Sequence, residues 1–371
     1  MFPVFGMIFE VRVFYHQSGS KSREWPGRAS NTDVIFEGMK KVSLTGIKPT
    51  GTPHLGNYLG AIRPALELAQ TYQPFYFIAD YHALTLTAMH NAPALRESIY
   101  QVAATWLALG LNPEEACFYK QSDIPEIFEL NWILSCFTPK GFMNRAHSYK
   151  DKVAKNVADG LDSDENINMG LFGYPCLMDA DILMFKSHVI PVGKDQKQHI
   201  EFARDVAHRF NNHYGKDLFV IPEPMIREET DVIPGLDGRK MSKSYGNTIE
   251  IFLEPKALKK KIGSIVTNSQ GVEEPKDPDT CNVFKLFKLF ATADQSADLA
   301  ARYRAGGLGW GHAKAELHGV LESTFSEARA RYNVLMADTA LIDKILAYGA
   351  AKARPVAKTL IEEIRETIGI P

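Results

Sequence analysis

The sequence has little cysteine and no long apolar run. Among its 371 residues there are four cysteines. They are Cys117, Cys136, Cys176 and Cys281. Because no two of them have the C-x₂-C spacing of a zinc site, and nothing marks a disulfide framework, we expect reduced thiols and no metal site. No apolar run reaches the roughly 18–20 residues that cross a membrane, so we expect no membrane association and a cytoplasmic protein.

The chain also lacks a surplus of positive charge. Its 42 Lys and Arg stand against 44 Asp and Glu, a net charge of −2. That balance excludes a protein that holds nucleic acid by bulk electrostatics alone, and we expect no DNA binding. A shaped basic groove is still compatible with it, and residues 256–371 carry 17 Lys and Arg against 14 Asp and Glu. The C-terminal part is therefore the region expected to face a polyanion.

The chain does contain an alternation of short apolar runs with longer amphipathic segments. The runs lie at 42–45, 75–79, 116–119 and 189–192, and the segments at 55–71, 95–109, 170–185 and 196–210. This order is typical of a parallel sheet with crossover helices. We therefore predict an α/β fold with a Rossmann-like catalytic domain.

Beyond residue 258 the strand pattern stops. Helical spacing at 282–291, 315–336 and 353–368 predicts a helical C-terminal domain, with Pro355 tolerated in the first turn of the last helix.

The predicted domains follow from these patterns. We place the catalytic domain at 39–255, with a polar, mobile insertion at 139–168, and the helical domain at 256–371. Residues 16–33 are polar and rich in Ser, Arg and Gly, and residues 1–15 are apolar without the features of a signal peptide, so we expect residues 1–38 to be an extension that is disordered or dispensable.

A turn rich in glycine and proline follows the first predicted strand. Residues 45–60 read Thr-Gly-Ile-Lys-Pro-Thr-Gly-Thr-Pro-His-Leu-Gly-Asn-Tyr-Leu-Gly. Glycine lets a nucleotide lie against bare backbone, and the N-terminus of the following helix directs N–H groups and a partial positive charge at phosphate. His54 and Asn57 add side-chain donors. Two of the glycines have the G-x₄-G spacing of a P-loop, but Asn57-Tyr58 replaces the Lys-Ser/Thr which that loop needs, so we reject a P-loop.

A second glycine-containing segment carries two lysines three residues apart. Residues 235–244 read Gly-Leu-Asp-Gly-Arg-Lys-Met-Ser-Lys-Ser. Nucleotidyl transfer gathers negative charge on the α-phosphate and the departing pyrophosphate, so cations held there lower the barrier. A lone Lys-x-x-Lys is usually a solvated face. The surrounding glycines and the upstream turn favour a catalytic role for Lys240 and Lys243.

The segment 173–183 determines the expected substrate. Tyr174, Met178 and Asp181 fall at i, i+4 and i+7, so they share one helical face. A carboxylate on an otherwise apolar face needs a donor, and burying it unpaired is costly. Asp179 points elsewhere and is expected to be solvated.

The two glycine-containing motifs resemble the HIGH and KMSKS signatures of class I aminoacyl-tRNA synthetases, most closely those of the tryptophanyl enzymes. The resemblance covers about residues 42–371. Its specific blocks are 45–62, 174–183, 191–201 and 240–244. Two departures are visible. Asn57 replaces the second His of the first signature, and Tyr245-Gly246-Asn247 stands where Asp-Pro-Asn is frequent, which bears on the movement of the loop.

The resemblance implies that ATP, with Mg²⁺, activates L-tryptophan as an adenylate, which then acylates the terminal ribose of tRNA(Trp). It also implies a homodimer whose helical domain contacts the anticodon. The residues implied for catalysis are Lys240, Lys243 and His54. Those implied for ATP binding are Lys48, Thr50, Gly56, Asn57, Lys152, Val192, Gly193, Met241, Ser242 and Ser244. Those implied for tryptophan binding are Asp181, as acceptor of the indole N–H, with Met178, Tyr174, His82, Asp195 and Gln196.

Several alternatives stay open at this point. His82 also suits a buried, satisfied histidine, and Asp181 a structural carboxylate satisfied within the protein. Asp195 also suits a helix-start residue that offsets the dipole. Tyrosine activation on the same scaffold would need a Tyr, Gln and Asp set aimed at a phenol, and the Met178 and Asp181 pair argues against it. A non-synthetase adenylyltransferase would normally lack so long a helical appendage. A binding protein that lost catalysis is disfavoured by the intact lysines and histidine.

Overall fold

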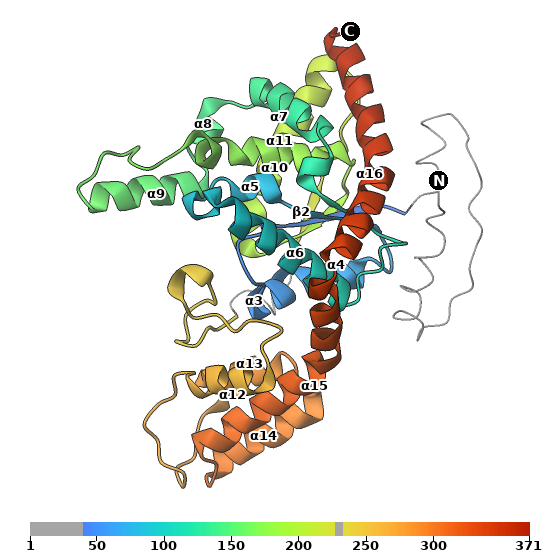
Figure 1. Ribbon diagram of the computed structural model, residues 1–371. Helices are drawn as coiled ribbons and strands as arrows, with labels where there is room; N and C mark the ends of the chain where they lie inside the picture. The colour runs from blue at the N-terminus through green and yellow to red at the C-terminus, as the bar shows by residue number, and fades with distance from the viewer. Residues whose placement is uncertain (1–39, 227–232) are drawn as a thin grey trace.

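The computed structural model describes residues 40–226 and 233–371 (Figure 1). The predicted extension at 1–38 lies outside these described residues. Within them, a parallel sheet wrapped by helices forms one part of the molecule and a group of helices forms the other.

The sheet has five parallel strands in the order β3-β2-β1-β4-β5. They are β1 (Val42–Ile47), β2 (Gln73–Ile78), β3 (Cys117–Lys120), β4 (Val189–Pro191) and β5 (Glu223–Met225). β1 and β2 pair over their full length, from Val42 with Gln73 to Ile47 with Ile78. The predicted fold class and the first four strands are confirmed. The edge strand β5 was missed, because a three-residue segment with a central proline lacks the strand pattern and is tolerated only at an edge.

Helices cover both faces of the sheet. One face carries α3 (Leu55–Asn57), the π-helical turn η1 (Tyr58–Ile62), α4 (Arg63–Leu68) and α6 (Ala92–Ala108). The other carries α7 (Glu126–Phe137), α10 (Met169–Met184) and α11 (Lys197–Tyr214). Short helices join these elements: α5 (Asp80–Ala83), η2 (Thr87–His90), η3 (Gln121–Asp123) and η4 (Lys194–Gln196). The strands are buried on both faces, which is why they read as continuous apolar runs.

The segment 139–168, expected to be a mobile insertion, is largely helical. It forms α8 (Lys140–Met143) and α9 (His147–Ala158). The buried side-chain amide of Asn156, in α9, donates to the carbonyls of Ser163 (3.1 Å) and Glu165 (2.7 Å). These bonds close the turn that follows the helix. The polar composition that suggested a connection belongs to a helix with a broad solvated face. Its mobility stays a prediction.

The helical part of the molecule has its own core. It contains α12 (Pro255–Gly263), α13 (Asn282–Lys288), α14 (Ala293–Ala305) and most of α15 (Trp310–Ala337), with the short turns η6 (Lys243–Tyr245) and η7 (Pro278–Thr280) before and between them. Leu55, Leu59 and Met241 belong to the same cluster of buried side chains. The glycine turn and the lysine loop therefore rest on the helical core.

The last helix, α16 (Thr339–Ile368), leaves this core and runs along the sheet (Figure 1). The prediction of a helix from 353 with Pro355 in its first turn is wrong. Asp338 caps a helix that starts 14 residues earlier, and Pro355 lies in its interior. At Gly349 a Cβ would come within 1.8 Å of the Phe118 carbonyl oxygen of β3, so only glycine allows this approach.

Tertiary packing explains why the proline does not end α16. Beyond Gly349 its buried side chains join the core formed by the sheet, α7 and α10. Arg354 and Arg365 pair with Glu126 and Glu129 of α7. The C-terminal half of α16 thus packs with the sheet, although the sequence suggested one helical unit from 256 to 371.

Candidate active site

A cavity of about 370 Å³ lies where the glycine turn meets the lysine loop. It is lined by Thr50, His54, Gly56, Asn57, Gly60, Gly193, Ile233, Lys240, Met241, Ser242 and Lys243. The turn follows the carboxyl end of β1, the position where open α/β sheets bind ligands. The two motifs, far apart in sequence, thus meet around one cavity.

The glycine turn is held by a reciprocal cap at the start of α3. Nδ1 of His54 accepts from the Gly56 N–H (3.1 Å), and Oδ1 of Asn57 accepts from the His54 N–H (3.0 Å). Burial, and secondarily the charge of Lys243, lowers the pKa of His54 to about 4, so the ring is neutral at pH 7. Since Nδ1 accepts, the proton of the neutral ring sits on Nε2, which leaves His54 with one donor for a ligand.

Lys243 crosses from the lysine loop to the glycine turn. Its Nζ donates to the carbonyl oxygens of Gly51 (2.8 Å) and Thr50 (3.1 Å). Gly51 has φ of 98°, a conformation that favours glycine, and this turns the carbonyls toward the lysine. Burial lowers the pKa of Lys243 to about 8, and the carboxylate of Glu250 opposes that shift. The ammonium is therefore largely charged at neutral pH and bound only by neutral oxygens, which a phosphate could replace.

The lysine loop is braced by Asn247, a residue that the sequence analysis treated only as part of a departure from the family pattern. Its Oδ1 accepts from the Ser242 N–H (2.8 Å), and its Nδ2 donates to Asp237 (2.7 Å) and to the Lys240 carbonyl (3.1 Å). Asn247 is buried, and a Cβ on Gly235 would collide with it. Of Tyr245-Gly246-Asn247, only this asparagine matches the family's Asp-Pro-Asn, a signal that could have identified it.

Most of the remaining residues predicted for ATP binding line the cavity or lie next to it, and the others do not. Thr50, Gly56, Asn57, Gly193, Met241 and Ser242 line the cavity. Ser244 lies next to it, with its Oγ 2.8 Å from the Ser242 Oγ. Val192 donates its N–H to the Met225 carbonyl and packs on the sheet core, and Lys152 lies on α9 and is not a lining residue. Neither of these two is brought to the cavity wall.

Lys48, also predicted for ATP binding, is not a lining residue either. Its Nζ lies 3.3 Å from the Thr85 Oγ1 and 5.8 Å from the centre of the Tyr174 ring. Burial lowers its pKa. Lys48 thus stands beside the residues predicted to bind tryptophan.

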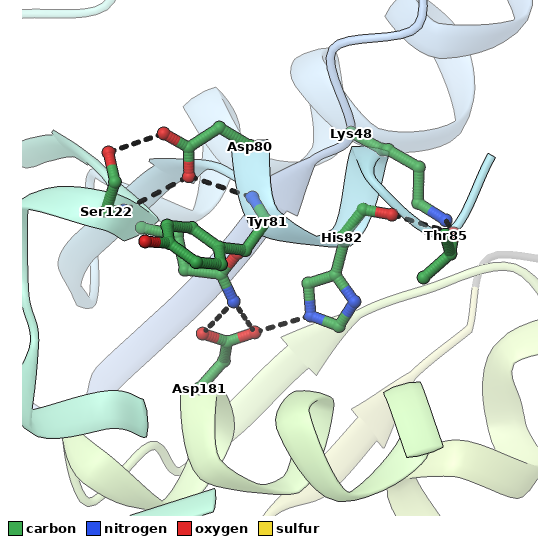
Figure 2. A network of polar contacts seen from close by, with 8 residues as sticks. Lys48, Asp80, Tyr81, His82, Thr85, Ser122 and Asp181 are labelled. Atoms are coloured by element: carbon green, nitrogen blue, oxygen red, sulfur yellow. Dashed lines mark hydrogen bonds and ion pairs between the residues drawn. The ribbon is translucent and has the colours of Figure 1, made fainter. Parts of the chain in front are cut away.

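Of the residues predicted for tryptophan, His82 contacts Asp181, a buried carboxylate of α10 (Figure 2). His82 Nε2 donates to its Oδ2 (2.9 Å), and Gln121 Nε2 donates to both oxygens (2.9 and 3.0 Å). Burial raises the pKa of Asp181, and the hydrogen bonds from His82 and Gln121 oppose that rise. The carboxylate that was expected to need a donor thus has two within the protein.

Gln121 was not predicted. It follows β3 at the carboxyl end of the sheet, as Asp80 follows β2, and that position is the signal that could have indicated it. Asp80 accepts from the Ser122 N–H (3.1 Å) and Oγ (2.5 Å), which ties the ends of the two strands together (Figure 2). The tie positions α5, which carries His82.

Tyr174 lies on the same side of the site. Its hydroxyl donates to the Ser148 Oγ (3.0 Å) and lies 2.9 Å from the His199 Nε2. Its ring stands edge-on to the His82 ring with centroids 6.3 Å apart. Met178 is partly buried against the sheet core. Gln196 is half-buried in η4, and the side chain of Asp195 lies outside the described part of the chain.

Asp179, expected to be solvated, is buried, and its Oδ1 has no hydrogen-bond partner. Burial, then the neighbouring Asp181 charge, raises its pKa well above the usual range. The expectation is wrong because α10 packs between α7 and α11 and has no solvated face here. Burial thus favours the neutral form of this carboxyl group.

Two negative findings delimit the chemistry. Over residues 40–226 and 233–371, no three His, Cys, Asp or Glu side chains come together as a metal would require. No helix within the same residues is long and apolar enough to span a membrane.

A family model described as "tRNA synthetases class I (W and Y)" matches residues 39–326. The Tryptophan--tRNA ligase of Pseudomonas aeruginosa is 51% identical over 331 residues, which is 88% of this chain and 73% of that protein. The Tryptophan--tRNA ligase of Neisseria meningitidis is 49% identical over 334 residues, 89% of this chain and 98% of that protein.

A solved structure gives the same result for the fold. The crystal structure of tryptophanyl-tRNA synthetase from Campylobacter jejuni, complexed with ADP and tryptophan, matches with a TM-score of 0.79 and 46% identity. The match covers 89% of this chain and all of that one.

Proposed function

The chain belongs to the class I tRNA synthetases of the tryptophan and tyrosine group, and from this premise we propose that it joins L-tryptophan to tRNA(Trp) using ATP. The chain is an ATP-dependent tryptophan--tRNA ligase in this proposal. Relatives at about 50% identity with that activity, and a solved relative that holds ADP and tryptophan, support it.

The observation that carries the proposal is the meeting of Lys243 with the carbonyls of Thr50 and Gly51 across the cavity. The cavity has cations on one side, and a glycine turn and a helix start on the other. This arrangement suits a triphosphate, because backbone N–H groups and lysines both stabilise phosphate charge. A neutral ligand would not require lysines and backbone N–H groups to be gathered around it.

The chemistry needs little more than positioning and charge. The tryptophan carboxylate is ionised at neutral pH, so its attack on the α-phosphate requires no general base. The bond to pyrophosphate breaks as the acyl-phosphate bond forms. Lys240, Lys243 and the Nε2–H of His54 would stabilise the negative charge that accumulates on the transferring and departing groups.

ATP would enter as its magnesium complex. Among the residues that the structure describes, no carboxylate lines the cavity, so these residues offer Mg²⁺ no anionic ligand there. That fits an ion which keeps several waters and binds phosphate oxygens directly. Mg²⁺ is therefore part of the substrate in this proposal.

The adenylate then passes its acyl group to the terminal ribose of tRNA(Trp). The helical region carries the positive surplus noted for residues 256–371, and unstacked anticodon bases are the part of a tRNA most readable by side chains. We assign anticodon contact to the helices of that region. A cytoplasmic location follows from the same proposal.

The second subunit of a homodimer would cover the aromatic face of α5 and α7. Trp132 is 72% exposed and Tyr81 is 47% exposed. Tyr81 packs on Phe128, which lies one helical turn before Trp132. Aromatic side chains exposed together are typical of interface centres. Light scattering would test this, since Trp132→Asp should yield monomers and an unchanged dimer mass would contradict it.

Tyrosine is the substrate that a test must separate from tryptophan. The buried site contains Tyr119, Gln121 and Asp181, the residue types that a phenol would need, so residue types alone do not discriminate. ATP–pyrophosphate exchange run with each standard amino acid makes the distinction. Exchange with tryptophan alone supports the proposal, exchange with tyrosine replaces it, and exchange with no amino acid rejects a synthetase.

A further inference from the structure

Two side chains hold Asp181 before any substrate is present. Gln121 Nε2 bonds both carboxylate oxygens, and His82 Nε2 bonds Oδ2. A carboxylate has about four lone-pair positions, two on each oxygen. Gln121 takes one on each oxygen and His82 takes the second on Oδ2. One acceptor position is left, on Oδ1.

The glutamine is held rigidly in this role. Gln121 is completely buried, in the short helix that continues β3. Its backbone carbonyl accepts from the Ile124 N–H (3.1 Å), and the Lys120 N–H donates to the Asp123 carboxylate (3.3 Å), so the backbone turn is closed on both sides. The amide has little freedom to turn away from Asp181.

The other end of the same amide has no hydrogen-bond partner among the described residues. Oε1 of Gln121 is buried and accepts nothing. An unsatisfied buried acceptor is unfavourable, and a well-packed core would not retain it for stability alone. The amide nevertheless keeps its NH₂ toward Asp181. We therefore attribute the presence of a glutamine at this position to its effect on Asp181, because its NH₂ group holds that carboxylate in one orientation.

Resting on the tryptophan specificity proposed above, we propose that Gln121 is the positioning residue that sets amino-acid selectivity. It holds Asp181 so that one acceptor position faces a substrate with a single ring N–H.

The surroundings determine how Asp181 would respond to loss of this bond. The titratable groups that face it are His82 from α5, Tyr119 from β3 and Asp179 from its own helix. Burial raises the pKa of Asp181, and the bond from Gln121 opposes that rise. Without Gln121 the pKa rises further, so the carboxylate takes up a proton at a higher pH than in the wild type.

The experiment is ATP–pyrophosphate exchange by the full-length protein with two substrates, tryptophan and 3-(benzothiophen-3-yl)alanine, in which sulfur replaces the N–H. Gln121→Met keeps the shape and removes the donors. We expect its tryptophan KM to rise about 10- to 100-fold, with kcat and the ATP KM within about twofold. Its preference for tryptophan over the analogue should fall at least about tenfold, and the acid limb of kcat/KM should move to higher pH.

A second variant tests the hydrogen bond itself. In Gln121→Glu the new carboxylate repels Asp181 at neutral pH, and the pair regains a hydrogen bond once it takes up one proton. The deficit in kcat/KM for tryptophan relative to wild type should therefore shrink as the pH falls from about 7 to about 5. No recovery in that interval would overturn the positioning role, even if Gln121→Met does not fold.

Ser122→Ala is the matched control. It removes the hydrogen bond from the Ser122 Oγ to Asp80 in the same turn, keeps the one from the Ser122 N–H, and does not touch Asp181. We expect lower thermal stability and an unchanged ratio between the two substrates. An equal loss of selectivity in this control would show that the turn, and not Gln121, matters. Absence of tryptophan-dependent exchange in the wild type would instead reject the proposed function.

Discussion

The cavity between the glycine turn and the lysine loop is built differently from the Asp181 site. Around the cavity most contacts come from backbone, as where Lys243 meets two carbonyls and His54 caps a helix. Around Asp181 the contacts join side chains from three separate elements, α5, η3 and α10. A phosphate group is highly charged and nearly symmetrical, so a short motif of lysines and backbone N–H groups is enough to bind it. An indole has one polar atom, and its recognition needs a buried, oriented partner.

The largest expected effect is on the cavity side of this comparison. Lys243→Ala should slow tryptophan-dependent pyrophosphate exchange by about 100-fold or more, because charge on the departing pyrophosphate loses its cation. Tryptophan affinity, measured by calorimetry, should change by less than about threefold. Lys259→Ala, an exposed lysine of α12, is the control and should keep the wild-type rate. Exchange at the wild-type rate in Lys243→Ala would refute its role.

The matching change on the other side is Asp181→Asn. Loss of the charge that Gln121 and His82 orient should raise the tryptophan KM by about 100-fold, while the ATP KM changes by less than about twofold. Steady-state kinetics with each substrate varied in turn make the measurement. Asp343→Asn, a surface carboxylate that accepts from the Tyr100 hydroxyl, should leave the tryptophan KM within about threefold. A rise in the ATP KM of Asp181→Asn would mean that the two sites are not independent.

A pH profile tests the cavity separately from the Asp181 site, because it titrates Lys243. The free enzyme carries charged Lys243 below its pKa of about 8, so kcat/KM for ATP should be maintained below that pH. As the pH rises from about 8 to 10 the ammonium loses its proton, and kcat/KM should fall about tenfold per unit. His54, with a pKa of about 4, should add no inflection between pH 6 and 9. In Lys243→Arg the decline should vanish, and its persistence would assign it to another group.

The smallest effect concerns the brace of the lysine loop. Asn247→Ala removes three hydrogen bonds from a buried amide and should lower the free energy of unfolding by about 2 kcal/mol. Exchange should slow by about tenfold or less, since the lysines remain. Thermal denaturation and exchange rates are the measurements. Asn268→Ala, on the exposed surface, should change neither, and a stable but inactive Asn247→Ala would give the asparagine a direct catalytic role.

Much of the architecture was predictable because it depends on local patterns. Four of the five strands and the crossover helices follow from runs and periodicity that act over a few residues. The failures are non-local. Pro355 suggested a late helix start, yet α16 continues through it because its buried face packs on β3 and α7. Asp179 was assigned to solvent because the sequence does not reveal that neighbouring helices cover both sides of α10.

The candidate site divides in the same way. Lys243, His54, Asn57 and Gly56 were identified from two short motifs, and the structure brings them to one cavity. Gln121 and Asn247 were missed, since a single buried amide leaves no pattern along the chain. Lys48 was assigned to ATP with the rest of its turn, but its long side chain reaches Thr85 and Tyr174 instead.

The order of residues along the chain was thus enough to predict the α/β class, the two glycine-containing motifs that line one cavity, and the helix that carries Asp181. Backbone conformation, glycine positions and helix starts depend on neighbouring residues, so they can be recognised from the sequence. The three-dimensional packing alone determined that Lys243 reaches Gly51, that Gln121 and His82 share one carboxylate, and that α16 returns to the sheet. These contacts join residues 60 to 230 positions apart, and only the burial of apolar surface brings such residues together.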